Sequence, residues 1–159
     1  MSEDLYIHQG SKEEQYTSLM PQVKGLLEGE KDLIANMANV CAALKEQFGW
    51  LWVGFYLVKE DELVLGPFQG PVACTRIKKG RGVCGSAWEK MESIIVEEVE
   101  KFPGHIACSS LSKSEIVIPL IINGEVKALL DADSEQLSFF DSTDKKYLEE
   151  IILLLEMDV

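Results

Sequence analysis

Residues 115–133, EIVIPLIINGEVKALLDAD, contain two apolar runs separated by an Asn-Gly pair. This pair between apolar runs is the strongest short-range signal of a β-hairpin. A strict two-residue turn would pair Glu115 with Ala132, on the face opposite both aspartates of the second run. One extra residue, as in a β-bulge, would instead pair Glu115 with Asp133 and bring three carboxylates, the third being Asp131, onto one face. We predict this irregularity if the three acids form one site.

Further strand-like runs precede the hairpin. WLWVGFYLV (50–58) and ELVLGPF (62–68) are rich in aromatic and β-branched residues and predict a second hairpin. SIIVEEV (93–99) reads as another strand, residues 82–91 as a short helix, and residues 101–114 as a long loop. The sequence therefore predicts five or six strands in which hairpins dominate.

Helical periodicity marks both ends of the chain. Residues 11–27 begin with a capping-box pattern at Ser11, and Pro21 is expected to kink or break this helix. Residues 32–48 form a second periodic segment, and a last helix follows Asp141. The fold class is therefore predicted as α+β, with a mainly antiparallel central sheet and the N- and C-terminal helices packed on one face.

Length and charge restrict the possible functions. The 159 residues fit one domain, 1–159, and the net charge of −12 repels phosphate backbones, so no nucleic-acid partner is expected. No apolar run approaches the roughly 18 residues of a membrane span, so no membrane partner is expected either. The start, MSEDLYIHQG, lacks the pattern of a signal peptide. We therefore expect a cytoplasmic protein with reduced thiols.

The four cysteines fall into two groups. Cys41 lies on the apolar stripe of a predicted helix and is expected in the core. Cys74, Cys84 and Cys108 lie in segments rich in glycine or small polar residues, which suggests one shared site. Structural zinc sites use close pairs such as C-x2-4-C, and these wide spacings do not fit them. We favour redox chemistry over zinc and expect no bound metal.

A basic, glycine-rich loop surrounds two of these cysteines. Positive charge stabilises a thiolate at Cys74 or Cys84, or receives the carboxylate of a small substrate. The alternative is a solvated basic hairpin. GRGVCG also fits G-x-G-x-x-G, but no strand–turn–helix–strand unit surrounds it, so no dinucleotide cofactor is expected. The basic residues of this loop are Arg76, Lys78, Lys79 and Arg81.

Acidic and aromatic side chains supply a candidate pocket. Clustered carboxylates at Glu115, Asp131 and Asp133 bind an ammonium group or raise one another's pKa, unless they form a strand end in solvent. Trp52 and Tyr56 share one face of a strand and either wall an apolar pocket or fill the core.

Together these residues resemble one known family. The free methionine-(R)-sulfoxide reductases, which are built on a GAF domain, are similar to this chain over roughly residues 30–150. The three cysteine blocks match in order and spacing; a departure is Ser109, where the family usually has aspartate. The similar stretches are WVGFYL (52–57), GPVACTRIKKGRGVCGSAW (70–88), HIACSS (105–110), SEIVIPL (114–120), LLDADS (129–134) and FFDSTD (139–144).

The resemblance implies a mechanism. Cys108 would attack the sulfoxide sulfur, methionine would leave, and the resulting sulfenic acid would be resolved by Cys84, with Cys74 as the alternative or later partner. Thioredoxin would restore the thiols, with no bound cofactor. The carboxylates would hold the substrate ammonium and protonate the sulfoxide oxygen, and Trp52 and Tyr56 would flank the methyl-bearing end.

One alternative function and one expectation about oligomeric state accompany this mechanism. A GAF module that binds a small molecule or senses redox state without turnover is the alternative function, although a sensor is normally joined to an output domain, for which 159 residues leave no room. Analogy with GAF folds suggests a homodimer.

Overall fold

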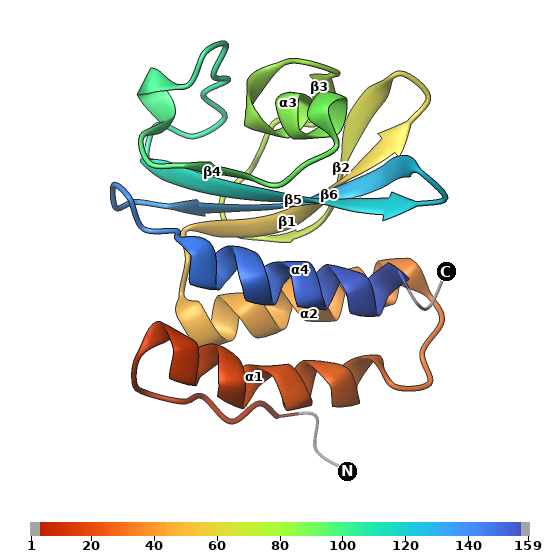
Figure 1. Ribbon diagram of the computed structural model, residues 1–159, viewed down its shortest axis with the longest axis vertical. Helices are drawn as coiled ribbons and strands as arrows, with labels where there is room; N and C mark the ends of the chain where they lie inside the picture. Colours follow the sequence, from red (N-terminus) through yellow and green to blue (C-terminus); the bar gives the residue numbers. More distant parts are fainter. Residues whose placement is uncertain (1–3, 157–159) are drawn as a thin grey trace.

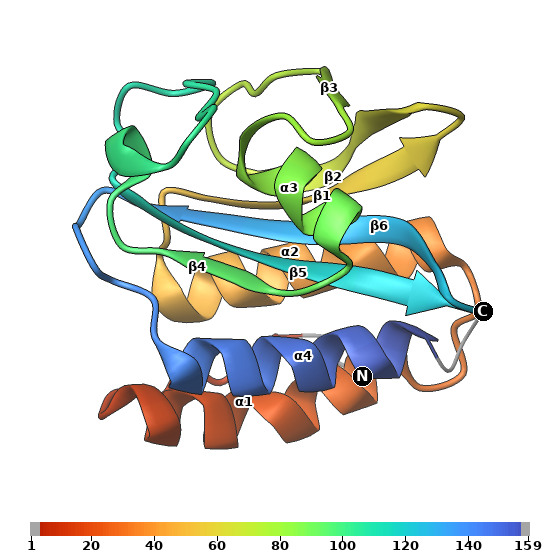
Figure 2. The same ribbon diagram turned by 45° about the horizontal axis from the view of Figure 1, so that its top comes forward.

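The computed structural model describes residues 4–156 and arranges them in layers (Figure 1). A six-stranded sheet lies in the middle. Helices α2 and α4 cover one face of this sheet, while α3 and the cysteine-bearing loops cover the other (Figures 1 and 2). The helices are α1 (Lys12–Leu27), α2 (Leu33–Phe48), α3 (Gly82–Lys90) and α4 (Ser142–Glu156), with a short 3-10 turn, η1 (Val99–Lys101).

The sheet has the order β3-β2-β1-β6-β5-β4, and every neighbouring pair is antiparallel. The predicted α+β class, the antiparallel sheet and the strand number are confirmed. The basic loop contributes the short edge strand β3, which its charge pattern did not reveal. The strands are β1 (Trp52–Lys59), β2 (Glu62–Gln69), β3 (Arg76–Lys78), β4 (Ile94–Val96), β5 (Ser114–Ile122) and β6 (Glu125–Ser134).

The hairpin β5–β6 contains the predicted irregularity. Near its turn Ile121 lies opposite Val126, but Leu120 lies opposite Ala128, so Lys127 is the extra residue of a bulge. All pairs beyond the bulge are shifted by one position, and Glu115 consequently lies opposite Asp133. The prediction that a bulge unites the three acids on one face is confirmed.

The first helix departs from expectation in two ways. Ser11 caps it as predicted, but the helix continues through Pro21, so of the expected kink or break the break does not occur. Its apolar face is buried, and this packing stabilises the helix although Pro21 cannot donate a backbone hydrogen bond. In addition, α1 packs on α2 and α4 and not on the sheet (Figure 1).

Two apolar cores lie on opposite faces of the sheet. The larger core, between the sheet and the helices α1, α2 and α4, contains Cys41, which is fully buried as predicted. The smaller core, on the face covered by α3, contains Trp52, Tyr56 and Cys84. Within residues 4–156 we find no helix with the length and hydropathy needed to cross a bilayer.

Candidate active site

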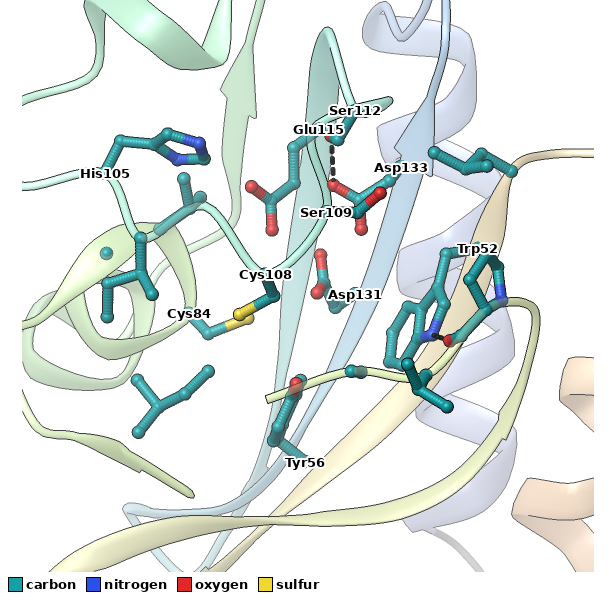
Figure 3. A pocket seen from close by; sticks show the side chains of 18 of the residues that line it. Trp52, Tyr56, Cys84, His105, Cys108, Ser109, Ser112, Glu115, Asp131 and Asp133 are labelled. Atoms are coloured by element: carbon teal, nitrogen blue, oxygen red, sulfur yellow. Dashed lines mark hydrogen bonds between the residues drawn. The ribbon is translucent and has the colours of Figure 1, made fainter. Parts of the chain in front are cut away.

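Two adjacent strands, β5 and β6, present the acidic residues to one cavity. On β6, Asp131 lies opposite Gly54 of β1, and Asp133 lies between Trp52 of β1 and Glu115 of β5. Residues directly opposite one another in an antiparallel pair point to the same face, so all three carboxylates lie on the α3 side of the sheet. Figure 3 shows them converging in this cavity, which also contacts Cys84 and Cys108.

Burial raises the pKa of each acid. Glu115 and Asp131 are only 7% and 6% exposed. Loss of hydration raises the pKa of Glu115 well above its ordinary value, and the neighbouring charges of Asp131 and Asp133 raise it further. The same cause raises the pKa of Asp131 and, more strongly, that of Asp133. Carboxyl groups of this kind hold a proton far more readily than exposed ones, as a general acid requires.

The carboxylates lack a cationic partner. None of the ion pairs found within residues 4–156 includes Glu115, Asp131 or Asp133. Asp133 accepts a hydrogen bond of 2.7 Å from the Ser112 hydroxyl (Figure 3). Asp131 Oδ1 is buried and has no hydrogen-bond partner among the described residues. An orphaned buried carboxylate oxygen is costly unless a ligand satisfies it, so the cavity is suited to a cation.

The cysteine bonded to Cys108 at this cavity is not the first partner that the resemblance implied. A disulfide joins Cys74 to Cys108, with Cα atoms 5.4 Å apart. Cys84 is free and buried. The bond thus joins Cys108 to the residue that was named as the alternative or later partner, and an earlier Cys84–Cys108 bond stays a prediction.

A thiolate at Cys84, one of the alternatives that the basic loop suggested, is disfavoured by its surroundings. Burial raises the pKa of this thiol well above its ordinary value, and the charges of Asp131 and Glu115 raise it further. Two basic residues of the loop have other partners: Arg76 pairs with Glu62, and Lys79 lies over the ring of Trp88. Basic residues lie near Cys84 along the chain, whereas acidic residues surround it in the folded protein.

Both predicted aromatic residues belong to the cavity wall and also tie down the segment that carries Cys74. The Trp52 indole donates to the Pro71 carbonyl at 3.1 Å, and the Tyr56 hydroxyl donates to the Cys74 carbonyl at 2.8 Å. Gly54 lies between them, and a Cβ there would come within 2.5 Å of the Trp52 ring. The indole therefore folds over this glycine.

Several further residues contact the cavity. Arg81, beside the N-terminus of α3, is exposed at the rim, as the proposed receptor of a carboxylate requires. His105 also contacts the cavity, and burial lowers its pKa against the opposing charge of Glu100. Ser109 accepts a hydrogen bond from the backbone of Leu111 and so stabilises a turn without adding charge.

Ser112 is the contact that sequence reasoning missed. It lies in the predicted loop, and only the bulge-shifted register of β6 brings Asp133 within its reach. A serine in a loop rich in serines carries no distinguishing signal in the sequence.

Comparisons with known proteins identify the fold and the family. A family model for the GAF domain matches residues 30–156, which identifies the class of protein. The structure superposes with a TM-score of 0.96 on free methionine-R-sulfoxide reductase from Neisseria meningitidis in complex with its substrate, with 52% identity, covering 99% of this chain and 95% of that chain. The Staphylococcus aureus protein in reduced form gives a TM-score of 0.87 with 42% identity, covering 90% and 94%.

Curated relatives extend this result. Free methionine-R-sulfoxide reductase from Escherichia coli is 42% identical, over 92% of this chain and 89% of that protein. GAF domain-containing protein A of Dictyostelium discoideum is 65% identical, over 98% and 99%. The chain belongs to the free methionine-R-sulfoxide reductase family, a family of oxidoreductases, as the sequence resemblance implied.

Proposed function

We propose that this protein reduces free L-methionine (R)-S-oxide to L-methionine, with Cys108 as the nucleophile. The observation that supports this most directly is the joint presence of Cys108 and three buried carboxylates around one cavity. The thiolate of Cys108 attacks the sulfoxide sulfur while an acid transfers a proton to the sulfoxide oxygen. Methionine leaves, and the oxygen remains on Cys108 as a sulfenic acid.

A second thiol then closes the cycle. Cys74 attacks the sulfur of the sulfenic acid, water leaves, and the Cys74–Cys108 disulfide forms; Cys84 is the alternative first partner. Support for Cys74 comes from the bond present in the structure and from the raised pKa of Cys84, which keeps that thiol protonated. Thioredoxin, a dithiol reductant, exchanges with this disulfide and is itself oxidised.

The pocket recognises the free amino acid. The substrate ammonium lies against Glu115, Asp131 and Asp133, which form no ion pair within residues 4–156. Its carboxylate lies at Arg81 and the N-terminus of α3, and its methyl-bearing end lies against the Trp52 and Tyr56 side of the cavity. A peptide-bound methionine brings no ammonium and leaves the acids unpaired. The cytoplasm, where thioredoxin keeps thiols reduced, is the proposed location, and the homodimer remains a prediction.

A coupled assay tests this function. Free methionine R-sulfoxide, thioredoxin, thioredoxin reductase and NADPH are supplied, and NADPH loss is followed. We expect turnover with the R epimer and little with N-acetylmethionine R-sulfoxide, in which the amine is blocked. Cys108→Ser should abolish turnover, whereas Cys41→Ser, a matched change in the other core, should leave it intact. NADPH loss that persists in Cys108→Ser would show that another residue is the nucleophile.

A further inference from the structure

Three potential metal ligands meet at the base of the active-site cavity. Cys84 Sγ and one carboxylate oxygen each from Glu115 and Asp131 all lie within 4.8 Å of one another. They come from α3, β5 and β6, and the three side chains converge in Figure 3. The cysteine spacing disfavours a zinc site built from close sequence pairs such as C-x2-4-C, but these three ligands come from separate elements that the fold brings together.

An independent observation points to a cation at this place. Asp131 is 94% buried, since it is 6% exposed, and its Oδ1 atom has no hydrogen-bond partner among the described residues. No lysine, arginine or histidine within residues 4–156 forms an ion pair with Glu115 or Asp131. The negative charge that these side chains carry when ionised is therefore uncompensated by the protein.

The donor set selects the kind of cation. One sulfur and two carboxylate oxygens suit a divalent ion that accepts thiolate, and Mg²⁺ or Ca²⁺ would require more oxygen ligands. Zinc bonds of about 2.0–2.3 Å place ligands of one ion roughly 3.5 Å apart. The spread of 4.8 Å thus needs only a small contraction of side chains. The cavity volume of about 60 Å³ leaves room for a water as the fourth ligand.

We propose that Cys84, Glu115 and Asp131 bind one Zn²⁺ ion, which excludes the substrate ammonium and inhibits the enzyme. The Cys84 thiol releases its proton to solvent when the metal binds, and no electrons are transferred. Cys84 is the one cysteine among the proposed ligands, and it is free, so binding takes place with the Cys74–Cys108 disulfide intact. The inhibition, but not the binding, rests on the proposed function.

Cobalt provides the direct test of binding. Co²⁺ is added to the disulfide-bonded protein, and the near-ultraviolet thiolate-to-cobalt charge-transfer band is recorded; Zn²⁺ should displace Co²⁺ and abolish the band. Cys84→Ser should lose the band. Cys41→Ser, which removes the other free cysteine, should keep it. Asp131→Asn should weaken Zn²⁺ retention after gel filtration at least tenfold, with unchanged circular dichroism. A band that is absent from the wild type, or retained in Cys84→Ser, would overturn the site.

Inhibition is measured separately, in a single turnover of pre-reduced enzyme, because thioredoxin and its reductase carry thiols that bind zinc. Methionine release is followed in zinc buffers. At free Zn²⁺ ten times its Kd, the half-saturating sulfoxide concentration should rise about tenfold with the maximal rate unchanged. An unchanged half-saturation in protein that retains zinc would refute the competition. Protein that binds cobalt but never releases methionine would refute the proposed function and leave the metal site standing.

Discussion

The hydrogen bond from Tyr56 to the Cys74 carbonyl offers a quantitative test of how the pocket holds the disulfide. Its length is 2.8 Å, and the pKa of Tyr56 is raised by burial, so the phenol stays protonated and donates at every working pH. A neutral hydrogen bond contributes about 1 kcal/mol net. If it forms in the disulfide state and is lost in the dithiol state, Tyr56→Phe should destabilise the Cys74–Cys108 bond about fivefold.

This factor converts into a reduction potential. For a two-electron couple about 1 kcal/mol corresponds to roughly 20 mV, so the Tyr56→Phe disulfide should be more oxidising by about that amount. The assay equilibrates each protein with glutathione redox buffers and measures the disulfide fraction by thiol alkylation and mass spectrometry. Tyr147→Phe is the control, because its hydroxyl bonds Glu13 on the helical side of the sheet. A potential that is unchanged or more reducing in Tyr56→Phe would refute the tether.

Three further predictions concern other parts of the molecule. Gly54→Ala introduces a Cβ 2.5 Å from the Trp52 ring, and overpacking of about 1–3 kcal/mol should raise KM for the free sulfoxide at least fivefold in steady-state kinetics. Asp144→Ala removes a fully buried carboxylate that forms a 2.6 Å ion pair with Lys12, and it should lower the free energy of unfolding in urea by about 3 kcal/mol. The control Lys146→Ala breaks an exposed ion pair with Glu13 and should change this free energy by under about 0.5 kcal/mol. The raised pKa of Glu115 means that the folded state binds this proton more tightly than the unfolded state, so stability falls as pH rises above the ordinary glutamate pKa. Glu115→Gln should therefore make stability less dependent on pH and raise Tm at neutral pH, while lowering kcat/KM. A Tm that falls instead would contradict the assignment.

The register of the β5–β6 hairpin could be predicted because a turn signal and a chemical requirement both constrained it. The Asn-Gly turn fixed where the strands reverse, and the requirement that Glu115 join Asp131 and Asp133 demanded one extra residue. The bulge at Lys127 supplies it. A local turn signal and a functional requirement thus specified a long-range pairing that neither determined alone.

Other features depended on contacts that a linear pattern does not encode. Cys84 is close in sequence to basic residues, but α3 turns its side chain toward acids from β5 and β6, and its pKa rises as a result. Helix α1 has an apolar stripe that fits either a sheet or other helices, and the structure uses the second option. Both outcomes are set by where separate elements pack, which local periodicity leaves open.

The division of the molecule into two cores explains how an unfavourable cluster of acids is tolerated. Burying three carboxylates beside a thiol, with no cation, lowers stability at neutral pH. The larger core on the opposite face of the sheet contains none of these groups and stabilises the strands that hold them. Among the described residues the cluster therefore has no cationic partner, and an arriving ammonium group would stabilise its ionised form. Because a free amino acid carries that ammonium and a residue within a peptide does not, selectivity follows from the same uncompensated charge that makes the cavity vulnerable to a divalent metal.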